Sequence, residues 1–238
     1  MRTVAKGDGT GRRIKEASFL LTLDDIKKNE EVNTLLKLAQ KQLEIRGFTE
    51  HSFRHVGRTA NTAGSILKKL GLDPRETELA RIAGYLHDIG NAVNRQDHAH
   101  TGAYMAYRIL TGMGMDYEEA GEIMQAIGNH DESSGTAVSN VSAALILADK
   151  SDVHRSRVTN KDIATFDIHD RVNYAVVKSE LVVDAENRKA ILQLEIDTLI
   201  CPVMDYFEIF LDRMKMNRGA AEFLGMKFEL IINKTQLL

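Results

Sequence analysis

Apolar residues recur with the spacing of an amphipathic α-helix through most of the chain up to about residue 157. A capping-box pattern at 22–25 opens the first such stretch, which predicts one helix that ends at Gly47. Short polar loops separate the stretches, so this part of the chain is expected to form a helical bundle. Further helices are expected over 49–71, from Asp73-Pro74 to Gly90, from Asp97 to Leu110, from Asp116 and Glu119 to His130, and from Ser139 or Asn140 to about residue 153.

The pattern changes after Asn160. Segments 171–184 and 189–197 are rich in β-branched residues and flank a polar turn, which predicts a β-hairpin. Pro202 opens an amphipathic helix, and 226–234 predicts a third strand. We therefore expect a mainly α fold. Its parts are a flexible tail at 1–21, a helical domain with the functional site at 22–160, and a small α+β subdomain at 161–238 packed on that domain.

Composition narrows the functional classes. The 238 residues carry a formal net charge of −3. The chain therefore lacks the excess of positive charge that is typical of proteins that bind long nucleic acid. Cys201 is the single cysteine, so an internal disulfide and a multi-cysteine metal site are excluded. No signal peptide or membrane-spanning run is evident. We expect a soluble protein of the cytoplasm with no membrane partner.

The pair His87-Asp88 stands at the end of an apolar helix, where a buried carboxylate is costly unless a cation neutralises it. Six of the eight histidines fall between 51 and 130, mostly at predicted helix ends, which favours metal ligation over packing. Asp149 follows the most apolar stretch of the chain directly. With His55, these residues offer nitrogen and oxygen ligands without sulfur, which suits zinc, iron, manganese or another first-row ion.

In its ordered pattern the chain resembles the HD superfamily of metal-dependent phosphohydrolases. The pattern is an early histidine at His55, then His87-Asp88-Ile89-Gly90, then Asp149, and it covers about residues 49–157. The resemblance implies an HD-domain helical bundle in which these residues bind metal. His51 is the alternative first ligand; we prefer His55, whose distance to His87 along the chain is similar to that in other family members.

A second metal is implied by resemblance to the bacterial diadenosine-tetraphosphate hydrolases of the same fold. His98, with Gly102-Ala103 after it, and His130 are similar to their two additional ligands. We thus expect one or two divalent transition-metal ions, among which Fe, Mn, Zn, Co and Ni are not distinguished. If two are bound, Asp88 bridges them at a separation of about 3.5–4 Å. His100 has no counterpart and is expected to face solvent or support a ligand.

Two features depart from relatives. Many of them have a lysine where this chain has Asn91, and the Gly-Tyr-Pro signature of cyclic-di-GMP phosphodiesterases is absent after His130, which disfavours that substrate. The nearest cations to Asp149 along the chain are Lys150 and Arg155, which we expect to neutralise phosphoryl oxygens and class as catalytic with Asp88.

Four other polar side chains are not assigned to the metal site. Arg157 could contact phosphate oxygens, but a role as a cation at the end of a helix explains it at least as well. Glu132 is either a proton shuttle or a loop acid. His154 and His169 are expected to be surface or structural residues.

The sequence thus predicts a phosphohydrolase that uses metal-activated water on a small phosphorylated substrate, a nucleotide above all. A di-iron oxygenase of the same fold and a nucleotide-sensing module without turnover are the alternatives. The methionine- and phenylalanine-rich face of 204–216 is expected to be ordinary core, with a homodimer interface as its alternative.

Overall fold

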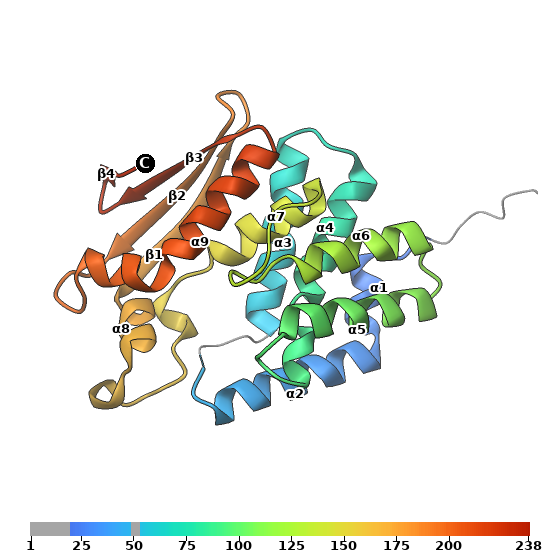
Figure 1. Ribbon diagram of the computed structural model, residues 1–238, viewed down its shortest axis with the longest axis horizontal. Coiled ribbons are helices and arrows are strands. Elements are labelled where there is room, and N and C mark those ends of the chain that lie inside the picture. Colours follow the sequence, from blue (N-terminus) through green and yellow to red (C-terminus); the bar gives the residue numbers. More distant parts are fainter. Residues whose placement is uncertain (1–19, 49–52) are drawn as a thin grey trace, which may run out of the picture.

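A computed structural model describes residues 20–48 and 53–238 (Figure 1). The predicted tail at 1–21 lies almost entirely outside these residues, as does His51. Seven α-helices and one short 3-10 helix make up the helical part of the described chain. They are α1 (Leu23–Lys28), α2 (Glu30–Ile45), α3 (Phe53–Lys69), α4 (Pro74–Leu86), η1 (Ile89–Ala92), α5 (His98–Gly112), α6 (Tyr117–Gly128) and α7 (Asn140–Lys150).

The first predicted helix is two helices. Thr22 forms the expected capping box with Asp25, but the helix breaks at Asn29, whose backbone is extended. The Asn29 side chain accepts a hydrogen bond from the backbone N–H of Val32 at 3.0 Å and so starts α2. The prediction of one helix was wrong because an asparagine can cap a new helix inside a continuous apolar pattern. Gly47, with φ of 74°, follows the end of α2 as expected.

Caps at the other helices follow the sequence in part. Asp73 accepts hydrogen bonds at the start of α4, and Pro74 occupies its first position. Asp116 caps α6 through the backbone N–H of Glu118, but Glu119 does not complete the box and pairs with an arginine of α4. Asp97 was predicted to cap α5 and does not, because its backbone is left-handed and its side chain makes no cap hydrogen bond.

Helix α7 is the centre of the molecule. Every residue from Val141 to Lys150 is buried, and α7 packs against α3, α4, α6 and α9. Two close approaches fix the helices that carry the site. A Cβ at Gly84 would lie 2.7 Å from the Cα of Ala60, so α3 and α4 are in backbone contact. A Cβ at Gly90 would lie 2.5 Å from the backbone nitrogen of Gly102, so η1 sits directly on α5.

The C-terminal part confirms the α+β subdomain and the mainly α fold class. It contains η2 (Arg155–Arg157), η3 (Ile163–Thr165), α8 (Ile168–Ala175), β1 (Val176–Asp184), β2 (Lys189–Ile196), α9 (Val203–Phe223), β3 (Lys227–Ile232) and β4 (Thr235–Gln236). The hairpin of β1 and β2 is antiparallel as predicted, but its first five residues, 171–175, belong to α8, which Asp167 caps.

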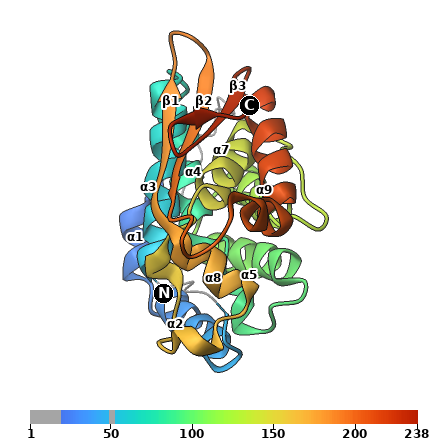
Figure 2. The same ribbon diagram turned by 90° about the vertical axis from the view of Figure 1, so that its left-hand side faces the viewer.

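The sheet has the order β1-β2-β3-β4, and β2 and β3 are parallel with α9 as the crossover. Helix α9 packs against both the sheet and α7, so it joins the subdomain to the helical core (Figure 1, Figure 2). On this helix Phe210 and Met214 are buried, whereas Met204 and Leu211 are exposed. Within residues 20–48 and 53–238, no helix has the length and apolar character needed to cross a membrane.

Candidate metal centre

Six polar side chains converge at helix ends. His55 comes from the first turn of α3, His87 and Asp88 follow α4, and Asp149 stands at the end of α7. His98 is the first residue of α5, and His130 follows α6. All six residues are at most 8% exposed. Such burial of two carboxylates and four imidazoles requires a compensating cation.

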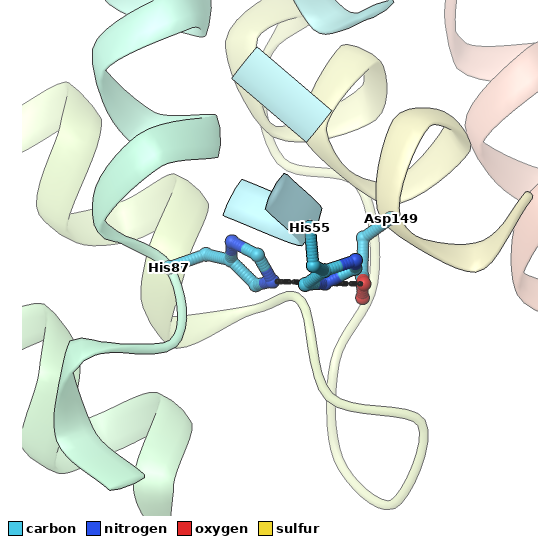
Figure 3. Close-up of side chains that lie close together, drawn as sticks. All are labelled: His55, His87 and Asp149. Atoms are coloured by element: carbon cyan, nitrogen blue, oxygen red, sulfur yellow. Dashed lines mark hydrogen bonds and ion pairs between the residues drawn. The ribbon is translucent and has the colours of Figure 1, made fainter. Parts of the chain in front are cut away.

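One half of the cluster contains His55, His87 and Asp149. The Nε2 atoms of His55 and His87 are 3.3 Å apart, and His55 Nε2 lies 3.3 Å from Asp149 Oδ1. Figure 3 shows the three side chains pointing toward one another from different elements. Their donor atoms are close enough together to hold one metal ion.

The other half adds His98 and His130, whose Nε2 atoms are 3.2 Å apart. Asp88 lies between the halves: its Oδ2 is 3.3 Å from His87 Nε2, and its Oδ1 is 3.7 Å from His98 Nε2. His87, Asp88 and His130 form a second group that could hold a metal ion. The structure thus brings together all six residues that the sequence nominated as ligands.

The outer ring nitrogens test whether these residues fit a metal. His87, His98 and His130 each place Nδ1 within 3.0 Å of a backbone carbonyl, those of Gly84, Arg95 and Ile127. Each Nδ1 must therefore carry the proton and donate it, which leaves an Nε2 lone pair facing inward. His55 Nδ1 lies 2.7 Å from a carboxylate oxygen of Asp152, with the same consequence. Four lone pairs facing two carboxylates fit a metal cation.

Electrostatics agree with this assignment. Burial, with the neighbouring His87 and Lys150, lowers the pKa of His130 to about 3, and burial also lowers the pKa of His98. Both imidazoles are therefore neutral, as metal ligands must be. Burial alone lowers the pKa of His87, but the Asp88 and Asp149 carboxylates outweigh it and raise that pKa to about 10. Without a metal His87 is therefore protonated, and a metal cation would take the place of the Nε2 proton between the two carboxylates.

A chain of charged side chains extends from the cluster to α9. Lys150 Nζ lies 2.8 Å from Asp149 Oδ2 and 3.0 Å from Glu132 Oε2. Arg213 Nε lies 2.5 Å from the other oxygen of Glu132. Lys150, predicted as a catalytic cation, is therefore held against a ligand carboxylate. Glu132 is paired with both cations, and burial, opposed by the stronger effect of Lys150 and Arg213, leaves its pKa below the usual range.

Arg155, the other predicted cation, lies over the ring of Tyr174 at 5.2 Å, and no contact with the six ligands is recorded among the described residues. Arg157 is buried and donates to the backbone oxygen of Asp152 at 2.7 Å. Burial and the charge of Arg213 lower the pKa of Arg157, and the carboxylates of Asp152, Asp149 and Asp88 oppose that shift.

Two residues beside the cluster were not singled out from the sequence. Asp152 supports His55 and pairs with Arg58 at 3.0 Å; its position three residues after Asp149 is the signal that could have found it. Arg95 Nη1 lies 3.2 Å from His98 Nε2 and 3.9 Å from Asp88 Oδ1.

Asn91 stands where many relatives have a lysine. Its Nδ2 donates to Asp88 Oδ1 at 2.8 Å, and Arg95, in the loop before α5, brings a cation 3.9 Å from the same oxygen.

The other three histidines of residues 20–48 and 53–238 lie apart from the cluster. His100 and His169 are exposed, as the expectation of solvent or surface positions required. His154 is half-buried and bonds to Ser156 and to the backbone oxygen of Val177, which makes it a structural residue.

A family model described as HD domain matches residues 52–193, which is more than half of the chain. The chain belongs to the HD domain family. The matched segment contains all six clustered candidate ligands and extends into β2, so the HD domain assignment includes the start of the C-terminal sheet.

Several known proteins are similar to this HD domain chain. An uncharacterized protein of Methanocaldococcus jannaschii is 30% identical over 56% of this chain and 60% of its own length. Ribonuclease Y of Opitutus terrae is 33% identical over 41% of this chain, and ribonuclease Y of Lawsonia intracellularis is 35% identical over 40%. The match spans only 17% of either ribonuclease.

Among solved structures, a protein described as a predicted HD superfamily hydrolase, from an uncultured Thermotogales bacterium, is 28% identical. The similarity covers 52% of this chain and 67% of that chain, with a TM-score of 0.41.

Proposed function

We propose that this HD domain protein is a metal-dependent phosphohydrolase that cleaves a phosphoester or phosphoanhydride bond of a nucleotide or another small phosphorylated metabolite. The observation that carries the proposal is the set of four inward Nε2 lone pairs facing two buried carboxylates. Family membership supports hydrolysis. The name ribonuclease Y, borne by two relatives, supports a phosphoester as the bond that is cleaved.

The residues would hold one or two divalent transition-metal ions. His55, His87 and Asp149 would hold the first, and His98 and His130 would join Asp88 in holding the second. Nitrogen and oxygen donors of this kind do not select among Fe, Mn, Zn, Co and Ni. A bound metal supplies a Lewis acid for a phosphoryl oxygen and lowers the pKa of water toward about 7.

The chain's own residues set up the reaction. Asp88 lies between the two halves of the cluster, and Asn91 holds one of its oxygens. Lys150 fixes the second oxygen of Asp149, so this carboxylate presents Oδ1 to His55 and His87. Lys150 also brings positive charge to the place where a phosphoryl group would gain negative charge. A catalytic role for Arg155 stays a prediction from the sequence.

The test is a metal analysis joined to a substrate panel. The protein is purified without added metal, and its bound metals are measured. Phosphate release from nucleotides, and strand or ester cleavage of phosphodiesters and a short RNA, are then assayed with and without Mn²⁺. We expect metal-dependent release from small substrates and its loss in Asp88→Ala. His100→Ala, which changes an exposed histidine beside His98, is the matched control and should keep activity.

Three outcomes would reject the proposal. Oxygen uptake without phosphate release would favour the di-iron oxygenase. Ligand-induced thermal stabilisation that survives Asp88→Ala, without product after long incubation, would favour a nucleotide sensor. Cleavage confined to RNA would replace the small substrate by a long one.

Two further proposals concern location and assembly. The single cysteine supports a cytoplasmic location. The exposed Met204 and Leu211 support a homodimer.

A further inference from the structure

A pocket of about 220 Å³ opens between the helical core and the α8–α9 part of the C-terminal subdomain. Its lining combines three arginines and two phenylalanines with polar residues of α8 and its cap. They are Arg46, Gly47, Phe48, Arg95, Asp167, His169, Asp170, Asn173, Phe210 and Arg213. The six candidate metal ligands are not among these described residues, so the pocket lies beside the metal centre rather than at it.

Two of the three guanidinium groups are held by aromatic rings. Arg213 lies over Phe210 with its Cζ 4.5 Å from the ring centroid, and Arg46 lies over Phe48 at 5.4 Å. A guanidinium that stacks on a ring uses its face and keeps its in-plane N–H groups for other partners. Arg46 donates one of these N–H groups to Asn94 Oδ1 at 2.9 Å. The remaining donors suit a phosphate, which accepts paired hydrogen bonds from arginine.

Two of the arginines, Arg95 and Arg213, connect the pocket to the metal centre. Arg95 lines the pocket and places Nη1 3.2 Å from His98 Nε2. Arg213 lines it too and reaches the centre through Glu132 and Lys150, which contacts Asp149. An anion in the pocket would therefore lie next to a phosphoryl group held at the metals.

The lining residues of α8 and its cap carry different chemistry. Asp167 accepts a hydrogen bond from the backbone N–H of Asp170 at 2.8 Å, and Asp170 in turn accepts one from Asn160 at 3.3 Å. These carboxylates repel an anion and so confine it to the arginine wall, while they can accept hydrogen bonds from hydroxyl groups of a ligand. The pocket thus distinguishes two ends of one small molecule.

We propose that this pocket binds a phosphate group of the substrate other than the one at the metal centre, with sugar hydroxyls toward α8. The identification of the ligand as the substrate rests on the proposed function, whereas the existence of the binding site does not. It also gives the C-terminal subdomain a role, because Arg213 and the α8 wall come from outside the helical domain.

The experiment measures binding without turnover. The full chain, freed of metal by EDTA, is titrated calorimetrically with adenosine 5′-monophosphate, inorganic phosphate and adenosine at low ionic strength. We expect the nucleotide to bind saturably and more tightly than phosphate, and adenosine not to bind. Arg46→Gln should weaken nucleotide binding at least about tenfold, since a hydrogen bond to a charged group is removed. Arg218→Gln, an exposed arginine on α9, is the matched control and should bind as wild type.

Two results would refute phosphate binding in this pocket. They are a lack of nucleotide binding to the metal-free wild type, and equal nucleotide affinities of the wild type and Arg46→Gln. Inorganic phosphate binding as tightly as the nucleotide would overturn its assignment to the substrate. Failure of the proposed function looks different, because nucleotide binding would persist while no member of the substrate panel was hydrolysed with any metal.

Discussion

Asp152 offers the sharpest test of the metal centre, because it touches a ligand and not the metal. Asp152 is 1% exposed, and its Oδ2 lies 2.7 Å from His55 Nδ1. Its other carboxylate oxygen pairs with Arg58 at 3.0 Å. Asp152→Asn keeps the volume and removes the negative charge. The hydrogen bond to His55 then loses its charge assistance, and the imidazole is less basic and less firmly oriented.

Loss of such a supporting contact typically weakens metal binding about 10-fold to 100-fold, or roughly 1.4–2.7 kcal/mol. The pair with Arg58 adds little, because that arginine side chain is 41% exposed and solvent screens it. The measurement is a competition titration with a chromophoric chelator, using Zn²⁺ and Mn²⁺ separately. Asp205→Asn removes a carboxylate that pairs with Arg171, away from the cluster, and should leave metal affinity unchanged.

A correctly folded Asp152→Asn protein with wild-type affinity for both metals would refute this reasoning. It would mean that His55 is oriented by α3 alone, or that His55 is not a ligand.

Three further predictions concern stability and metal removal. Gly90→Ala should destabilise the protein by about 1–3 kcal/mol in urea unfolding, because its Cβ would strike the backbone of α5, whereas Gly121→Ala, with open space around it, should not. Burial and two neighbouring glutamates raise the pKa of Glu122 above 4.5, so its charged form costs stability above that pKa and the cost disappears as the pH falls below 4.5. Glu122→Gln should therefore stabilise by roughly 0.2–0.5 kcal/mol at about pH 7, with no gain at about pH 3.5; an equal gain at both values would contradict this. Adding metal at about 100 times its Kd to chelated protein should raise the unfolding free energy by about 2.7 kcal/mol, and an unchanged melting temperature would argue against a metal site.

Much of the fold and of the candidate site was readable from the sequence, because the signals are local. The period of the apolar residues gave the helices, and caps such as Thr22 and Asp73 gave where they start. His87, Asp88 and Asp149 stood out because polar residues at the ends of apolar helices need a partner. His55, His98 and His130 were assigned through the resemblance to HD proteins. Local signals failed where two readings compete over a few residues, as at Asn29, which begins a helix inside a continuous apolar pattern, and at 171–175, which are helical despite strand-like composition.

Tertiary structure decided which side chains support the ligands and which line a pocket. Arg213 is distant from the HD motif in sequence, and only the packing of α9 against α7 brings it to Glu132. Arg155 is near Asp149 along the chain, yet its guanidinium lies over Tyr174. Sequence proximity predicts contact only while the helix continues, and α7 ends at Lys150. The ligand residues were thus set by local chemistry, whereas their charged surroundings depend on contacts between distant elements that no local pattern encodes.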